Sequence, residues 1–177
     1  MKSIQGFTLI ELIMIILLTS ILAMSGYHVM NFVVRNTFFL PNQVQADLVA
    51  AEALEIIVEG DDQAKGLRFC KAVTTAGANQ VVVTNQDDQT ITYSLSGGSL
   101  FRTIDPGAAV MIPYFKAGDM TLSGVFTYYD AAEAVTAVPA NVRRIKIDLM
   151  AQNGAGSSDK YEGYSQQSSS VKVNKYL

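Results

Sequence analysis

The sequence predicts an α+β fold, in which a long N-terminal helix packs on an antiparallel β-sheet domain. Three patterns lead to this prediction: an apolar run at the start of the chain, a helical pattern after it, and then short alternating segments separated by polar and glycine-containing turns. With 177 residues, the chain has room for one modest domain and one long appended element.

The apolar run carries no formal charge between Glu11 and Arg35. At about 1.5 Å per helical residue, this stretch reaches roughly 35 Å, which is enough to cross the hydrocarbon core of a bilayer. A secretory signal peptide would have a shorter apolar core followed by its cleavage site, whereas here the small residue, Gly6, precedes the run. Spacing alone favours a signal anchor, with Lys2 keeping the N-terminus in the cytoplasm.

Glu11 lies close to the start of this run, where a lone carboxylate in hydrocarbon costs a few kcal/mol unless a partner neutralises it. The nearby cation of the chain is Lys2, and a new amino terminus would supply another if the chain were cut between the two residues. The sequence therefore predicts a partner for Glu11.

The stretch from Gly6 to Glu11, GFTLIE, resembles the prepilin leader junction of the type IV pilin superfamily. That family includes type IV pilins, minor pilins and the pseudopilins of type II secretion. The resemblance implies cleavage between Gly6 and Phe7 by a prepilin peptidase, and N-methylation of Phe7. It also implies that Glu11 assists the packing of one subunit's helix against the next.

Cleavage at this junction would place an ammonium group on Phe7, four residues before Glu11. Opposite charges attract strongly at low dielectric, although desolvation removes much of the gain. The two groups could neutralise each other within one helix, because positions four apart share a face. Alternatively, the amine of one subunit could meet Glu11 of a neighbour and set the axial register, which the family resemblance favours.

The chain departs from many pilins, which carry a helix-breaking proline about two-thirds of the way along the apolar stretch. Gly26 occupies that neighbourhood and loosens a helix by only about 1 kcal/mol relative to alanine, which weakens the assignment to a major pilin. Pro41 is predicted to kink or interrupt the helix near the point where it leaves the membrane. His28 is interpreted as an interfacial side chain.

After Pro41 the helical pattern resumes and places Val44, Leu48, Ala51 and Val58 near one face, which is predicted to pack on the globular domain. The acidic residues of this half are interpreted as a solvated face. Combined with the resemblance, these signals predict three parts. They are a prepilin leader (1–6), a long helix (7–59) that spans the membrane over about 7–34, and a β-rich domain (60–177).

The rest of the chain is predicted to form antiparallel strands. In the best-defined one, Ile145, Ile147 and Leu149 alternate with polar residues, as expected for a half-buried strand. The pair Gly97 and Gly98 suits a tight reversal within a three-stranded meander. The predicted strands are 80–84, 90–95, 100–104, 124–130, 142–150 and 168–177. Their pattern is similar to that of minor pilins and J-type pseudopilins.

Two loops, 105–119 and 151–167, either bind neighbours or clients or are ordinary connections. The acidic pairs at 61–62 and 87–88 could ligate calcium, but carboxylates are common in turns and no EF-hand spacing is present. Neither a metal site nor a cofactor is predicted.

Enzyme chemistry is not expected, and no catalytic residue is predicted. With His28 in the apolar stretch, no histidine remains for a Ser-His or Cys-His pair in the globular part. The sequence also has no dinucleotide-binding glycine motif, P-loop or nucleophile elbow. Cys70 is interpreted as a small buried side chain on a strand.

The formal net charge of −3 argues against a basic surface for nucleic acid. The predicted function is that of a minor pilin or pseudopilin in a type IV pilus or a type II secretion pseudopilus. The protein would be a single-pass inner-membrane protein with its C-terminal domain in the periplasm, or outside the cell once assembled. The expected partners are other pilin or pseudopilin subunits, a prepilin peptidase and an inner-membrane assembly platform. The alternatives are a major type IV pilin and a signal-anchored periplasmic binding module that never assembles.

Overall fold

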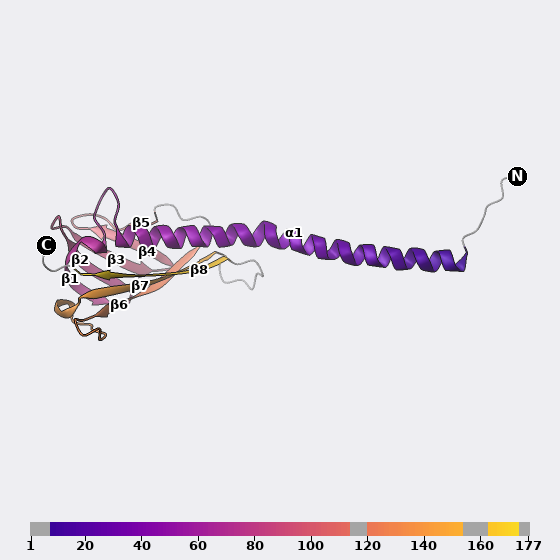
Figure 1. Ribbon diagram of the computed structural model, residues 1–177. Helices are drawn as coiled ribbons and strands as arrows, with labels where there is room; N and C mark the ends of the chain where they lie inside the picture. Colours follow the sequence, from indigo (N-terminus) through magenta and orange to yellow (C-terminus); the bar gives the residue numbers. More distant parts are fainter. Residues whose placement is uncertain (1–7, 114–119, 154–162, 174–177) are drawn as a thin grey trace. The chain divides into compact units, whose positions relative to one another are not determined.

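The computed structural model describes residues 8–113, 120–153 and 163–173, with only the backbone described at 38–39. One long helix followed by antiparallel β-sheets confirms the predicted α+β fold (Figure 1). The chain forms two compact units, residues 1–40 and 41–177. Gly6 and Phe7 lie outside the described residues.

The helix α1 (Leu9–Val58) is 50 residues long and continues through Pro41. The helix is therefore not interrupted at Pro41, and that part of the prediction is wrong, whereas the kink stays a prediction. A proline removes one backbone hydrogen bond and costs about 3 kcal/mol, but the helical bonds on either side of it can still form. The boundary between the two compact units coincides with this proline.

The second half of α1 packs on the sheets through a different face from the predicted one. Val44, Leu48 and Ala51 are exposed, so the prediction is wrong for these three residues, although Val58 is buried as expected. Half of the buried face consists of alanines, whose small side chains let the helix approach the sheets closely. Its members are Ala46, Val49, Ala50, Ala53, Ile56 and Ile57.

A five-stranded antiparallel sheet has the order β1-β2-β3-β4-β5. Its strands are β1 (Cys70–Gly77), β2 (Gln80–Asn85), β3 (Thr90–Ser96), β4 (Ser99–Ile104) and β5 (Val110–Ile112). The predicted meander corresponds to β2, β3 and β4. The turn between β3 and β4 is made by Gly97 and Gly98, whose φ values of 56° and 71° suit a two-glycine hairpin turn. The 105–119 loop differs from the prediction because it contains β5.

A three-stranded antiparallel sheet has the order β6-β7-β8. Its strands are β6 (Thr121–Tyr129), β7 (Arg144–Asn153) and β8 (Gly163–Lys172). The alternation predicted for β7 is confirmed, since Ile145, Ile147 and Leu149 are buried. The 151–167 loop is shorter than predicted because β7 and β8 stay paired as far as Asn153 and Gly163. Two short 3₁₀ helices, Leu67–Phe69 and Pro139–Asn141, complete the described elements.

The two sheets are joined by hydrogen bonds from β6. The backbone N–H groups of Leu122 and Phe126 donate to the carbonyl oxygens of Gly98 and Ala78, at 2.8 and 2.9 Å. The hydroxyl of Tyr128 donates to the carbonyl oxygen of Gly77 at 2.8 Å and is 3.0 Å from that of Gln80. Burial raises the pKa of this hydroxyl above its ordinary value of 10.0.

We expect Tyr128→Phe to lower the free energy of unfolding by about 1 kcal/mol at neutral pH, because the hydroxyl's hydrogen bonds between the sheets are lost. The raised pKa means that the unfolded state ionises first. The contribution of Tyr128 is therefore complete below the ordinary pKa of 10.0 and is lost as the pH rises through the higher folded-state value.

Urea unfolding of the detergent-solubilised protein, followed by far-ultraviolet circular dichroism between pH 7 and pH 11, checks this expectation. The Tyr128→Phe protein should lose less stability above pH 10 than the parent protein, whereas Tyr164→Phe, which removes an exposed hydroxyl, should follow the parent. Parallel pH profiles for the parent and Tyr128→Phe proteins would contradict the interpretation.

Candidate processing and assembly site

Glu11 lies in the first turn of α1, and Thr8 directly precedes the helix. The backbone N–H and the hydroxyl of Thr8 donate to Oε2 of Glu11, at 3.4 and 3.3 Å. In return, the backbone N–H of Glu11 donates to Oγ1 of Thr8 at 3.4 Å. These reciprocal contacts form a capping box, in which each side chain satisfies a backbone donor of the other residue.

The capping box explains in part why a carboxylate is tolerated at this place. The first N–H groups of a helix have no partner within the helix, and an unsatisfied group costs several kcal/mol in hydrocarbon. A negative charge in the first turn also interacts favourably with the helix dipole. The sequence signal for this arrangement is the spacing T-x-x-E from Thr8 to Glu11.

The contacts of Thr8 leave part of the Glu11 carboxylate available. Both donors of Thr8 bond to Oε2, and no described residue bonds to Oε1. The Glu11 side chain is exposed. A cation from outside this helix can therefore reach Oε1 while the cap stays formed.

The rest of the first half of α1 is an apolar surface. An 18-residue window of this helix has a mean hydropathy of 2.3 with none of the window buried, so the helix is long and apolar enough to cross a membrane. A shallow groove on it is lined by Ile13, Ile16, Leu17, Ser20 and Ile21. This surface fits a membrane-anchored protein.

The serine and threonine hydroxyls in this half donate to carbonyl oxygens of the same helix. The hydroxyls of Ser20 and Ser25 each donate to a carbonyl oxygen four residues earlier, at 2.7 and 2.9 Å, and Thr19 and Thr37 do the same. No hydroxyl of this group needs a water molecule. His28 makes an edge-on contact with Tyr27, with 5.9 Å between ring centroids, and its interfacial role stays a prediction.

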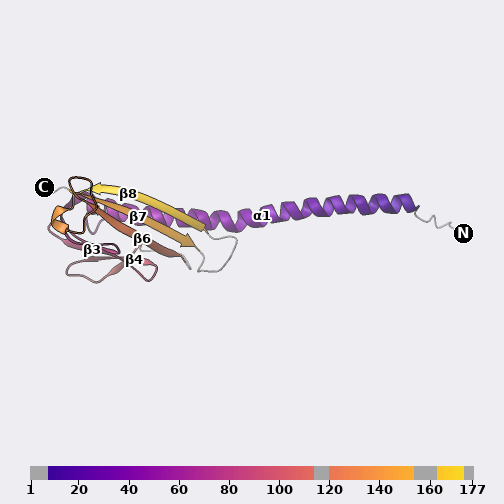
Figure 2. The same ribbon diagram turned by 90° about the horizontal axis from the view of Figure 1, so that it is seen from below.

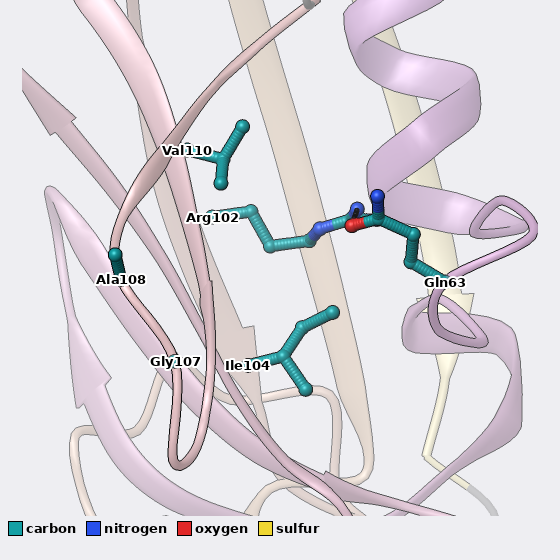
Figure 3. Close-up of a pocket in the computed structure, with 6 residues that line it drawn as sticks. All are labelled: Gln63, Arg102, Ile104, Gly107, Ala108 and Val110. Carbon is teal, nitrogen blue, oxygen red and sulfur yellow. Dashed lines mark hydrogen bonds between the residues drawn. The ribbon is translucent and has the colours of Figure 1, made fainter.

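A second polar cluster lies in the globular unit, where β4 holds Arg102 (Figure 3). Its guanidinium donates to both carboxylate oxygens of Asp61, at 2.8 and 2.9 Å, and to Oε1 of Gln63 at 3.3 Å. The Arg102 side chain is 1% exposed and that of Asp61 is 20% exposed. The same carboxylate accepts the backbone N–H groups of Gln63 and Ala64. This ion pair fixes the turn after α1 to the five-stranded sheet.

A cavity of about 230 Å³ adjoins this ion pair. It is lined by Gln63, Arg102, Ile104, Gly107, Ala108 and Val110 (Figure 3). Arg102 is the charged group in the lining, and Asp61 already neutralises it. The cluster is therefore explained by stability rather than by chemistry on a ligand.

Three of the four carboxylates considered for calcium have cationic partners. Asp61 pairs with Arg102, Asp87 with Lys65 at 3.1 Å, and Asp88 with Lys71 at 2.7 Å. Among the described residues, no group of three or more potential ligands could hold a metal ion. A calcium ion at either pair would have to displace these cations.

Cys70 is fully buried at the start of β1, as predicted. Its thiol is 3.2 Å from the carbonyl oxygen of Ala72 and donates to it. This position fits a small core side chain.

Residues 1–27 match the family model of the prokaryotic N-terminal methylation motif. The match includes Gly6, Phe7 and Glu11, and it confirms the resemblance to the type IV pilin superfamily. No curated protein and no solved structure matches the chain. Proteins with this motif are structural rather than enzymatic, and the motif implies processing by a prepilin peptidase and assembly with other pilin subunits.

Proposed function

We propose that the protein is a minor pilin or pseudopilin, assembled from the inner membrane into a type IV pilus or a type II secretion pseudopilus. The observation that carries this proposal is the methylation motif at residues 1–27, which includes the start of an exposed apolar helix at Leu9. In this proposal residues 1–6 are the leader, about 7–34 cross the membrane, and 60–177 form the periplasmic domain. Prepilin peptidase cuts between Gly6 and Phe7, and Phe7 is then methylated.

The proposed mechanism is mechanical. Before assembly, lipid covers the apolar surface of α1, and in the filament the helices of neighbouring subunits cover it. Because lipid is as apolar as leucine, this exchange gains little from hydrophobicity and depends on close packing and polar contacts between helices. The groove at Ile13, Ile16 and Leu17 is suited to receive side chains of a neighbouring helix.

Glu11 supplies the polar contact in this proposal. N-methylation keeps the positive charge of an amine, so the methylated Phe7 of one subunit still carries a counter-ion for Glu11 of the next. Oε1 of Glu11 is available for that contact while Oε2 stays bonded to Thr8. The assembly platform and the other subunits are the proposed partners.

Photo-crosslinking in cells tests the assembly part of the proposal. A photoreactive amino acid at Ile16, in the groove of α1, should give covalent adducts with other pilin-like subunits. The same amino acid at Glu52, exposed on the second half of the helix, measures crosslinking from a position outside the membrane segment. Adducts at Ile16 should disappear in cells without prepilin peptidase. If Ile16 gives no subunit adduct in cells that make filaments, the protein is instead a membrane-anchored module that does not assemble.

A further inference from the structure

β8 is the outermost strand of the three-stranded sheet (Figure 2). All ten of its residues pair with β7 in unbroken register, from Gly163 opposite Asn153 to Lys172 opposite Arg144. Between Tyr164 and Val171 the strand has no charged residue and no proline. Natural proteins commonly protect such an edge with charges, prolines, bulges or a covering element.

The other sheet edges in the described part of the chain are protected. The edge of β6 is bonded to turns of the other sheet, through Leu122 and Phe126. β1 contains two register shifts, which disturb its regular edge. β5 is only three residues long. β8 is therefore the long regular edge of this domain.

One side chain already bonds to this edge as a neighbouring strand would. Nε2 of Gln43 donates to the carbonyl oxygen of Tyr164 at 2.6 Å, and the backbone N–H of Tyr164 donates to Oε1 of Gln43 at 3.1 Å. The primary amide thus makes the two hydrogen bonds that a backbone partner makes. Gly163 allows this close approach, because a Cβ there would lie 2.1 Å from the carbonyl oxygen of Asn42.

The direction of the remaining backbone groups follows from these bonds. Both polar backbone groups of Tyr164 point away from β7, and residues of an antiparallel strand alternate between its two edges. The N–H and C=O groups of Gln166, Ser168 and Ser170 therefore also point outward. The bond from the N–H of Val173 to the carbonyl oxygen of Arg143, at 2.8 Å, agrees with this alternation.

A groove of about 410 Å³ separates this edge from α1. Its lining is formed by Ala51, Leu54, Glu55, Val58, Glu59, Arg68, Gln167 and Ser169. The apolar wall on the helix consists of Ala51, Leu54 and Val58. Glu59 pairs with Arg68 at 2.5 Å, whereas Glu55 is exposed and has no ion-pair partner among the described residues.

We propose that the edge of β8 binds an extended segment of another protein, which adds a fourth strand to the sheet. The backbone of this segment pairs with Gln166, Ser168 and Ser170. Its alternate side chains enter the groove, where small apolar residues contact Leu54 and a lysine or arginine faces Glu55. This contact lies in the globular unit and is separate from the proposed packing of the apolar half of α1.

A second copy of the chain fits the groove less well. If β8 paired with β8 of another copy, the side chains of that copy that face the groove would be Ser165, Gln167 and Ser169. These are neither apolar nor basic, so they would match neither the apolar wall nor Glu55. The chemistry therefore favours a different protein as the donor of the strand.

The test uses the full chain in detergent and a capped eight-residue peptide that alternates valine and threonine, with one central valine replaced by lysine. Amide hydrogen exchange, read residue by residue by nuclear magnetic resonance, should slow at Gln166, Ser168 and Ser170 when this peptide is added. Two further peptides carry N-methyl groups on alternate backbone nitrogens. The two peptides differ in which alternating set of nitrogens is methylated. In one of them the N–H donors to β8 are blocked, and we expect it to bind at least about tenfold more weakly than the parent peptide. In the other these donors are free, and we expect it to bind like the parent peptide.

Ser168→Pro gives an independent test on the protein side. It removes an N–H group that points outward, so it costs no backbone hydrogen bond to β7. The side-chain hydrogen bond between Ser168 and Asp148 of β7 is lost in this variant and equally in Ser168→Ala. We expect Ser168→Pro to weaken binding of the peptide about tenfold or more, whereas the Ser168→Ala protein, which keeps the N–H group, should bind the peptide normally. Glu55→Gln should weaken binding of the peptide that contains lysine. It should not change binding of the version that keeps valine at that position.

Three results would overturn the proposal. The first is exchange at β8 that the peptide does not change, and the second is equal binding of both N-methylated peptides. The third is slow exchange at β8 that depends on protein concentration without peptide, which would assign the edge to a second copy of the chain. The peptide comparison does not depend on whether the Ser168→Pro protein folds.

Discussion

Replacing Glu11 with alanine is expected to leave the protein in the membrane and to remove it from filaments. In the proposed assembly, the methylated amine of Phe7 enters an apolar helix bundle and finds its counter-ion at Oε1 of Glu11. Removing one partner of a buried ion pair costs about 3–5 kcal/mol, which is more than about a hundredfold in an equilibrium constant. Immunoblots that compare sheared filaments with the membrane fraction measure this loss.

Two further variants separate the charge of Glu11 from its capping bonds. Glu11→Gln loses the charge but keeps an oxygen that can accept the backbone N–H of Thr8. We expect it to fail in assembly like the alanine variant. Glu52→Ala removes a carboxylate from an exposed position of the same helix and should assemble normally. Normal assembly of Glu11→Gln would mean that the cap, and not the charge, is what matters.

Asp61→Asn is expected to lower the free energy of unfolding by about 3–5 kcal/mol. The substitution takes the Asp61 carboxylate away from the Arg102 guanidinium, which is 1% exposed. Asparagine can still accept the backbone N–H groups of Gln63 and Ala64, so the local turn is kept. Urea unfolding of the detergent-solubilised protein, followed by far-ultraviolet circular dichroism, measures the change.

The neighbouring residue supplies the control for this prediction. Asp62→Asn alters an exposed carboxylate and should change the stability by less than about 0.5 kcal/mol. Adding Arg102→Met to Asp61→Asn should restore part of the loss, because an apolar side chain of similar length then fills the buried position. If Asp61→Asn unfolds at the same urea concentration as Asp62→Asn, the ion pair is not a major contribution to stability.

Local pattern was enough to predict most of the strands. Alternation at Ile145, Ile147 and Leu149 defines one buried face of β7, and the glycine pair at 97–98 defines the hairpin between β3 and β4. Both signals are local, because they depend on side-chain direction and backbone conformation of adjacent residues.

The prediction failed where the result depends on packing between distant elements. Val44 and Leu48 are larger and more hydrophobic than Ala46 and Ala50, but the two alanines are the buried pair. Small side chains allow α1 to lie close against the sheets, and composition alone does not report this distance. The continuity of α1 through Pro41 likewise depends on the helix on both sides of the proline.

In the candidate site, too, the local features were predictable and the contacts between distant residues were not. The motif around Glu11 is local, and so is its capping box with Thr8, which the spacing already contained. By contrast, Arg102 and Asp61 are 41 positions apart in sequence, and no pattern in the chain connects them. Their pairing exists only because β4 passes beside the turn that follows α1.

Intact-mass and N-terminal peptide mass spectrometry of the protein purified from cells with an active prepilin peptidase tests the proposed function most directly. We expect a mature chain that begins at Phe7 and carries a methyl group on its amino nitrogen. A mature chain that still begins at Met1 would contradict the proposed function, because Glu11 would then have no amine at Phe7 with which to pair.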